Sequence, residues 1–140
     1  MAKRKQQQTL LTKLELEVMQ VVWDATRDAD GDEPITVREV VERLNRGRKK
    51  PLAYNTVQTM LTILKEKKVM SSEKGDGRAH RYRPLVSREQ ITTSMVGDLV
   101  DRLFDGKVQP LLVQLVGNET LDRDELKKLK RLIETQLDND

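Results

Sequence analysis

Apolar side chains near the start of the chain recur at helical spacing and form two stripes. One stripe consists of Leu14, Val18, Val21, Val22 and Ala25, and the other of Leu16, Met19 and Trp23. Two stripes predict a helix that is buried on two sides. The segment Thr12 to Glu15 has the spacing of a capping box, which predicts where this helix begins. We therefore expect a central core helix, with Trp23 in the core rather than serving as a platform for a ligand.

Two further helices are predicted after an acidic turn. Thr36 to Glu39 forms a second capping box, and a short amphipathic helix should follow it. A third helix is expected over about residues 53–67, with its inner face formed by Val57, Met60, Leu61 and Leu64. The opposite face of this helix carries polar groups, namely Asn55, Gln58, Thr59, Thr62 and Lys65.

Residues 69–74 and 78–84 have the pattern of two short strands around the turn sequence Gly75 to Gly77. They predict a hairpin with a basic tip. Three helices followed by such a hairpin are typical of the winged helix-turn-helix, whose third helix enters the major groove of DNA. The expected fold class is therefore mainly α with a small β-wing, and residues 1–84 form a DNA-binding domain.

Residues 85–140 are predicted to form three more apolar helical segments. Capping boxes stand at Ser87 to Gln90 and at Asp122 to Glu125, and Asp105-Gly106 separates the first two segments. So few residues cannot bury this much apolar surface alone, which favours an intertwined homodimer and a helical dimerisation domain. The candidate dimer-interface residues are Ile91, Met95, Leu99, Leu103, Phe104, Leu111 and Leu115.

Composition indicates a globular chain, because 36% of the 140 residues are hydrophobic and 35% are charged. Charge is unevenly distributed: residues 1–84 carry 18 Lys/Arg against 12 Asp/Glu, whereas residues 85–140 carry 8 against 11. Residues 43–83 alone hold 12 basic and 3 acidic side chains. This concentration is typical of a surface that neutralises phosphates, and a merely solvated basic face is the alternative.

Several functional classes are excluded or disfavoured. The chain has no cysteine and one histidine, which excludes disulfides, thiolate metal sites and multi-histidine metal cages. No nucleophile-base pair or glycine-rich phosphate loop is present, so we expect neither an enzyme nor a cofactor. No apolar stretch is long enough to span a membrane, and the first residues lack the apolar core of a signal peptide, so a cytoplasmic protein is expected.

Amide groups on the third helix suit direct recognition of DNA bases. Asn55 and Gln58 can each form two hydrogen bonds to adenine, and Thr59 can contact base edges or thymine methyl groups. The candidate contacts to the DNA backbone are Lys49, Lys50, Tyr54, Thr62, Lys65, Lys68, Arg78 and Arg81. His80 has two open interpretations, a wing contact or a surface residue without a role. A winged helix that docks on protein is the main alternative function.

Four of these segments together resemble the penicillinase repressor family, the BlaI/MecI/CopY group of bacterial regulators, over residues 11–137. They are Leu14 to Trp23, Thr36 to Val40, Ala53 to Leu61 and Gly77 to Pro84. The resemblance implies a homodimeric repressor that occludes a promoter by binding a dyad-symmetric operator. It also implies that Asn55, Thr56, Gln58 and Thr59 face the bases.

Two departures from the family limit what the resemblance implies. The copper-responsive branch ends in a cysteine-rich motif, which this chain lacks, so copper sensing is not expected. In the antibiotic-responsive branch a membrane-bound sensor protease triggers cleavage near an Asn-Phe pair. The corresponding segment here, Phe104 to Gln109, lacks that pair, so a sensor protease or another inducing system stays open as a partner.

Overall fold

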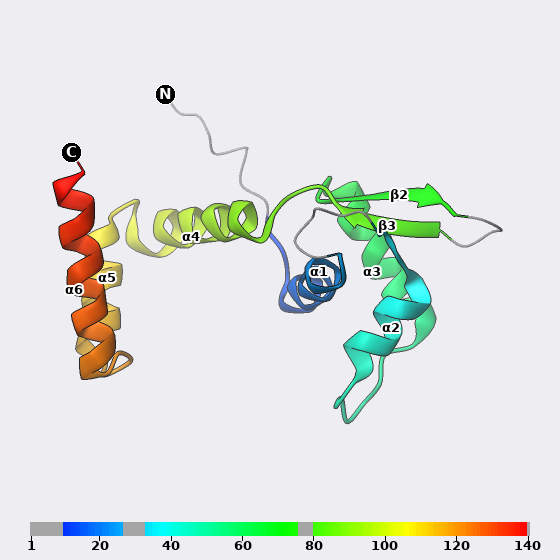
Figure 1. Ribbon diagram of the computed structural model, residues 1–140, viewed down its shortest axis with the longest axis horizontal. Coiled ribbons are helices and arrows are strands. Elements are labelled where there is room, and N and C mark those ends of the chain that lie inside the picture. Colours follow the sequence, from blue (N-terminus) through cyan, green and yellow to red (C-terminus); the bar gives the residue numbers. More distant parts are fainter. Residues whose placement is uncertain (1–9, 27–32, 76–79, 140) are drawn as a thin grey trace. The chain divides into compact units, whose positions relative to one another are not determined.

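The computed structural model describes residues 10–26, 33–75 and 80–139, and its elements are labelled in Figure 1. In chain order they are α1 (Lys13–Ala25), β1 (Ile35–Thr36), α2 (Val37–Asn45), α3 (Tyr54–Glu66), β2 (Met70–Lys74), β3 (His80–Pro84), α4 (Arg88–Phe104), α5 (Val108–Gly117) and α6 (Arg123–Asp138). This order confirms the predicted class, mainly α with a small β-sheet.

All four predicted capping boxes are present. At α1 the Glu15 backbone N–H donates to Thr12 Oγ1 over 3.1 Å, and the Thr12 N–H donates to Glu15 Oε1 over 2.9 Å. The same reciprocal pair of hydrogen bonds forms at Thr36, Ser87 and Asp122. Each pair satisfies an otherwise unpaired N–H of the first helical turn, which is why these starts were predictable from four residues.

The core lies between α1, α2, α3 and the sheet. Trp23, Met19 and Leu61 are the largest of its fully buried side chains. The predicted inner faces of α1, α2 and α3 all contribute to it, and the buried Tyr82 closes it from the sheet side. Trp23 is therefore a core residue, as predicted, and its Nε1 donates to the Val86 carbonyl over 2.9 Å.

The sheet has three antiparallel strands in the order β1-β3-β2, whereas the sequence predicts only the last two. Ile35 of β1 is paired with Tyr82 of β3, and Ser72 of β2 is paired with Tyr82 from the other side. A strand of two residues is too short to produce a detectable alternation of polar and apolar positions. This is why β1 escapes prediction from the sequence.

The chain divides into two compact units, residues 1–96 and 97–140, and the division falls within α4. The predicted boundary after Pro84 lies earlier in the chain. The first turns of α4 complete the core of the first unit, because Ile91 is buried in it and Met95 packs against it. Arg88 lies over the Trp23 ring, 5.3 Å from its centroid, and pairs with Asp24 over 3.0 Å.

The second unit holds the rest of α4 together with α5 and α6. The α4 helix ends at two residues with positive φ, Asp105 and Gly106, as the predicted break requires. The α5 helix begins at Val108, two residues before Pro110. Pro110 is tolerated inside its first turn, where the backbone N–H has no helical partner in any case. Neither α5 nor α6 contains a buried side chain.

Candidate nucleic-acid interface

The outward face of α3 carries the side chains that the sequence predicts to contact bases. Val57, Leu61 and Leu64 are buried and fix this helix to the core. The predicted contacts lie on the exposed side of the same helix, and they are Tyr54, Asn55, Thr56, Gln58, Thr59, Thr62 and Lys65. Residues three and four apart on a helix are neighbours, so Asn55, Gln58 and Thr59 share one surface. The α3 helix therefore presents amides and hydroxyls together, available to a partner.

Thr62 differs from the other polar groups on this face because its hydroxyl is already engaged. Thr62 Oγ1 donates to the Gln58 backbone carbonyl over 3.1 Å. A hydroxyl that donates its proton to its own helix retains its lone pairs as acceptors only. Toward DNA, Thr62 is thus a poorer donor to phosphate than the sequence suggests. The Gln58 side chain is exposed on the same face.

The loop between α2 and α3 is fixed by a side chain that the sequence analysis did not single out. The Leu52 N–H donates to Asn45 Oδ1 over 2.8 Å, and Asn45 Nδ2 donates to the Leu52 carbonyl over 3.0 Å. Arg48 pairs with Glu17 of α1. Lys49 and Lys50 remain exposed between these two attachments. The loop therefore holds two exposed cations shortly before α3.

The end of α3 carries a second group of cations. Lys65 and Lys68 are exposed, and Lys68 has a positive φ of 64°. The Val69 N–H donates to the Leu64 carbonyl over 3.2 Å and closes the helix around this residue. Positive φ is uncommon for a residue with a side chain, so the helix terminus fixes the position of Lys68 at some conformational cost.

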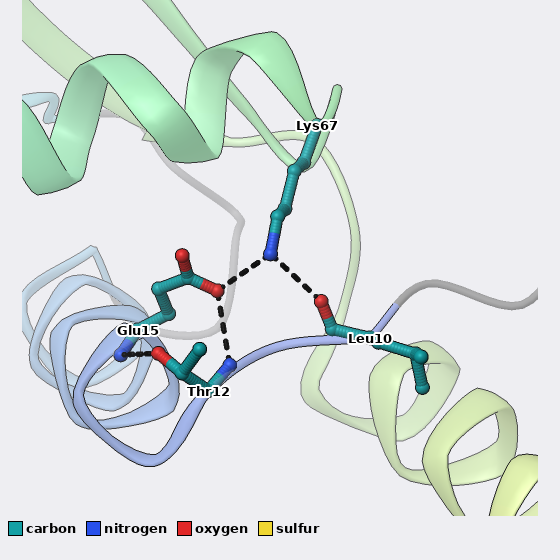
Figure 2. A network of polar contacts seen from close by, with 4 residues as sticks. All are labelled: Leu10, Thr12, Glu15 and Lys67. Atoms are coloured by element: carbon teal, nitrogen blue, oxygen red, sulfur yellow. Dashed lines mark hydrogen bonds and ion pairs between the residues drawn. The ribbon is translucent and has the colours of Figure 1, made fainter.

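Lys67, between these two cations, belongs to the fold rather than to the free surface. Its Nζ lies 2.7 Å from Glu15 Oε1 and 2.9 Å from the Leu10 carbonyl, so that it joins α3 to the start of α1 (Figure 2). Burial alone would raise the pKa of the Glu15 carboxyl, but hydrogen bonds from Lys67 and from the Thr12 backbone outweigh it and lower the pKa. Glu15 therefore stabilises the fold in its charged form.

The wing strands β2 and β3 supply the remaining candidates. His80 is exposed and is paired with Lys74 across the hairpin. Arg81 is half-buried, and Arg83 pairs with Glu73 over 3.3 Å. Arg78, the other predicted wing contact, lies outside the described residues. Burial raises the pKa of the Tyr82 phenol, and its electrostatic interaction with Tyr54 raises it further.

The predicted dimer-interface residues fall into two groups. Ile91 is only 3% exposed and belongs to the core of its own chain, so it offers no surface to a second chain, contrary to the sequence prediction. Met95 is half-buried against the same core. The others lie in the second unit, where Phe104 and Leu111 are half-buried and Leu99, Leu103 and Leu115 are exposed.

Two further properties concern the described part of the chain as a whole. Within it, no three His, Cys, Asp or Glu side chains come together in a group that could hold a metal ion. None of the described helices is long and apolar enough to cross a membrane.

The chain is similar in sequence to known regulators of one family. The family model of the penicillinase repressors matches residues 11–135. The transcriptional regulator BlaI of Mycobacterium tuberculosis is 36% identical over 126 residues, which cover 89% of this chain and 83% of that protein. The penicillinase repressor of Staphylococcus aureus is 20% identical over 119 residues, which cover 85% of this chain and 92% of that protein.

Two solved structures extend the comparison. The DNA-binding domain of the repressor BlaI is 29% identical, with a TM-score of 0.46, over 57% of this chain and 85% of that one. The Orc1 protein of Aeropyrum pernix, solved in complex with DNA, is 17% identical with a TM-score of 0.51, and the match covers 66% of this chain and 26% of that one. At this identity the second likeness concerns the fold alone. Because the family model spans nearly the whole chain, the protein belongs to the penicillinase repressor family.

Proposed function

We propose that this protein is a transcriptional repressor that binds a specific DNA sequence as a homodimer. The observation that carries the proposal is the exposed face of α3, where Asn55, Gln58 and Thr59 present hydrogen-bonding groups. The acidic residue of this helix, Glu66, is its last. Amides form paired hydrogen bonds to adenine in the major groove, and a threonine methyl group packs against thymine. Thr56 is assigned to the same set of base contacts.

The cations around this face are assigned to the DNA backbone. Lys49 and Lys50 precede α3, and Lys65 and Lys68 lie at its end, and all four are exposed. Lysines at both ends of a recognition helix neutralise phosphates and fix the register of the helix in the groove, whereas bases determine the sequence. The remaining assigned backbone contacts are Tyr54, Thr62, Arg78 and Arg81. A protein-docking winged helix has little use for such a surface.

The exposed apolar residues of the second unit support a homodimer. Leu103, Leu115 and Leu137 are exposed in the single chain, as are further apolar residues of α5 and α6. Exposed apolar side chains that gather into one large patch mark an interaction site. A second copy of the chain would cover it with the same surface, and two winged helices related by a two-fold axis would match an operator of dyad symmetry. We place this regulator in the cytoplasm, with the DNA.

Selection of binding sites from a random DNA pool, at about 150 mM salt to suppress non-specific binding, tests the proposal. The expected result is an enriched inverted repeat with half-sites about one helical turn apart. Gln58→Ala should then cost about 1 to 3 kcal/mol on that operator and relax the base preference at one position. Lys65→Ala, the matched control, should weaken operator and random DNA alike.

One outcome would contradict the proposal as a whole, and another would contradict only the assignment of Gln58. An unenriched pool would leave a winged helix without sequence preference, and the protein-docking alternative would replace the repressor. Equal losses on operator and random DNA for Gln58→Ala would remove Gln58 from the base contacts, while an enriched operator would still support the repressor.

A further inference from the structure

The loop between α2 and α3 has a defined backbone course, although it belongs to neither helix (Figure 1). It begins with a type II β-turn, in which the Arg48 N–H donates to the Asn45 carbonyl over 3.0 Å. The two central residues have the backbone angles of this turn, with φ −60° and ψ 124° at Arg46 and φ 73° at Gly47. Glycine adopts such a positive φ without the steric cost that a side chain brings. The first half of the loop is therefore fixed by its own sequence.

The same loop is attached to the rest of the winged-helix unit on both sides of its two lysines. Before the lysines, Arg48 forms an ion pair with Glu17 of α1. After them, the Leu52 N–H donates to Asn45 Oδ1 over 2.8 Å, and Asn45 Nδ2 donates to the Leu52 carbonyl over 3.0 Å. The Leu52 side chain also packs against the core. The loop is thus joined to α1 through Arg48 and to α2 through Asn45.

Lys49 and Lys50 lie between these attachments and differ from them in exposure. Both lysines are exposed, whereas Arg48 and Leu52 are half-buried. A cation on a mobile loop loses conformational freedom when it binds a phosphate, and a cation on a loop that is already fixed loses less. The attachments therefore favour any phosphate contact that the two lysines make.

We propose that Asn45 is a positioning residue for DNA binding, which holds Lys49 and Lys50 where they contact phosphates of the DNA backbone. The inference rests on the proposed DNA-binding function. Asn45 does not have to touch DNA, since both polar groups of its side chain are engaged with Leu52. It is also uncharged, so it affects an electrostatic contact only through the position of the lysines.

The experiment measures Kd for the selected operator and for random DNA at several salt concentrations, with the 140-residue chain. Asn45→Ala removes both hydrogen bonds to Leu52 and leaves the net charge unchanged. It should weaken binding to both DNAs about fivefold or more at about 150 mM salt. The slope of log Kd against log salt should fall by about one, because each phosphate contact contributes about 0.9. A loss of fold stability alone would leave this slope unchanged.

A double-mutant cycle tests whether Asn45 acts through the lysines. Lys49→Gln combined with Lys50→Gln should weaken binding by the wild type about tenfold or more, because two phosphate contacts are lost. In the Asn45→Ala background the same two changes should have an effect at least about threefold smaller, since the lysines there already make fewer contacts. Lys65→Gln is the matched control. Lys65 is exposed at the end of α3, outside this loop, so its effect should be equal in both backgrounds.

Gly47 provides a second test in case Asn45→Ala does not fold. Apart from its chain neighbours, no atom lies within 4 Å of a Cβ built at Gly47, so a substitution there acts through the positive φ. Asparagine tolerates this φ better than alanine does. Gly47→Ala should therefore displace the turn and reduce both affinity and salt slope, whereas Gly47→Asn should bind like the wild type. Urea denaturation followed by Trp23 fluorescence checks that each variant is folded, because Trp23 is buried in the core.

The outcomes separate this inference from the function on which it rests. A wild-type salt slope in Asn45→Ala, or an undiminished effect of the lysine changes in that background, overturns the positioning role and leaves the repressor function intact. A loss confined to the operator overturns it as well, because α3 is then the element that moves. If Asn45→Ala is unfolded, equal salt slopes in Gly47→Ala and Gly47→Asn overturn it.

Failure of the proposed function is seen in the wild type alone. If operator and random DNA bind equally, sequence-specific repression fails, and the cycle on random DNA still decides the role of Asn45. If the wild type binds neither DNA, the function and the positioning role both fail.

Discussion

The two units of this chain have the same kind of apolar pattern in their helices, but they differ in whether the apolar face is buried within the single chain. In the winged-helix unit the apolar face of α1 is buried, and Val18, Met19 and Val22 are completely inaccessible. In the second unit the corresponding face of α6 is mostly exposed: Leu129 is half-buried, but Leu126 is 36% exposed and Leu137 67%. The first unit covers its own apolar surface, and the second presents it.

This difference shows what a hydrophobic period can and cannot predict. Leu126, Leu129, Ile133 and Leu137 recur as regularly as the apolar residues of α1. Regular spacing identifies a face that must be covered, because exposed apolar surface is unfavourable in water. It does not identify what covers that face. The apolar face of α1 packs against the same chain, and we propose that the apolar face of α6 packs against a second copy of the chain.

Separated fragments give the largest expected effect. Residues 1–96 should fold alone and unfold cooperatively at any protein concentration, because their core is complete. Residues 97–140 should be helical at high concentration and lose helicity on dilution, since short helices without tertiary contacts are marginal in water. Far-UV circular dichroism across a dilution series measures both. Helicity of the 97–140 fragment that is unchanged on dilution would contradict the contrast between the units.

The boundary of the first unit gives the next largest effect. A fragment of residues 1–84 lacks Ile91, which is buried, and the Val86 carbonyl, which accepts the Trp23 indole N–H. It should be less stable than residues 1–96 by about 3 kcal/mol or more, because a buried side chain and a partly buried hydrogen bond are both lost. Denaturation followed by Trp23 fluorescence compares the two fragments. Equal midpoints and slopes would return the boundary to Pro84, where the sequence alone predicts it.

The features predicted correctly from the sequence are those that depend on residues close together in the chain. Four capping boxes and the turn at Asp105-Gly106 each depend on a few consecutive residues, and all five are present in the structure. The face of α3 was predictable for a similar reason, because its period fixes which residues point away from the core. Whether these residues contact bases stays a prediction.

The features that escaped prediction depend on residues far apart in the sequence. The Asn45 side chain fixes the loop before α3 through Leu52, and β1 exists only because β3 returns beside it. Ile91 has the same spacing as Leu99 and Leu103, yet it belongs to the first unit's core. No local pattern distinguishes an apolar residue that meets its own chain from one that meets another chain. Only the packing of the start of α4 on the first unit makes that distinction.

Leu103→Asp tests directly whether a second copy of the chain covers the exposed apolar residues of the second unit. Leu103 is 69% exposed in the single chain, so the substitution should leave the first unit folded. In a homodimer it places an unpaired charge in the interface, which should raise the dimer dissociation constant by about a hundredfold or more. Analytical ultracentrifugation measures the constant, and operator affinity should fall with it. Arg131→Gln, on the polar side of α6, changes the charge equally and should leave the dimer intact. An unchanged dimer in Leu103→Asp would remove Leu103 from the interface.

Glu15→Gln should give the smallest effect. It tests whether the ion pair between Glu15 and Lys67 stabilises the first unit. Glutamine keeps the capping box with Thr12, so the substitution removes mainly the charge that pairs with Lys67. At pH 7 we expect a loss of about 1 to 2 kcal/mol in the free energy of unfolding, because hydrogen bonds to charged groups are worth about this much when partly exposed. The loss should not depend on protein concentration.

The pH dependence of this loss has a defined sign. The pKa of Glu15 is lowered in the folded chain, so its contribution is complete above the ordinary value of 4.5 and disappears as the pH falls through the lower, folded value. Wild type and Glu15→Gln should therefore differ at pH 7 and converge in acid, as measured by urea denaturation. Glu42→Gln, on the exposed face of α2, is the matched control and should follow the wild type. A difference that persists undiminished to pH 2 would show that packing, rather than the charge of Glu15, joins α1 to α3.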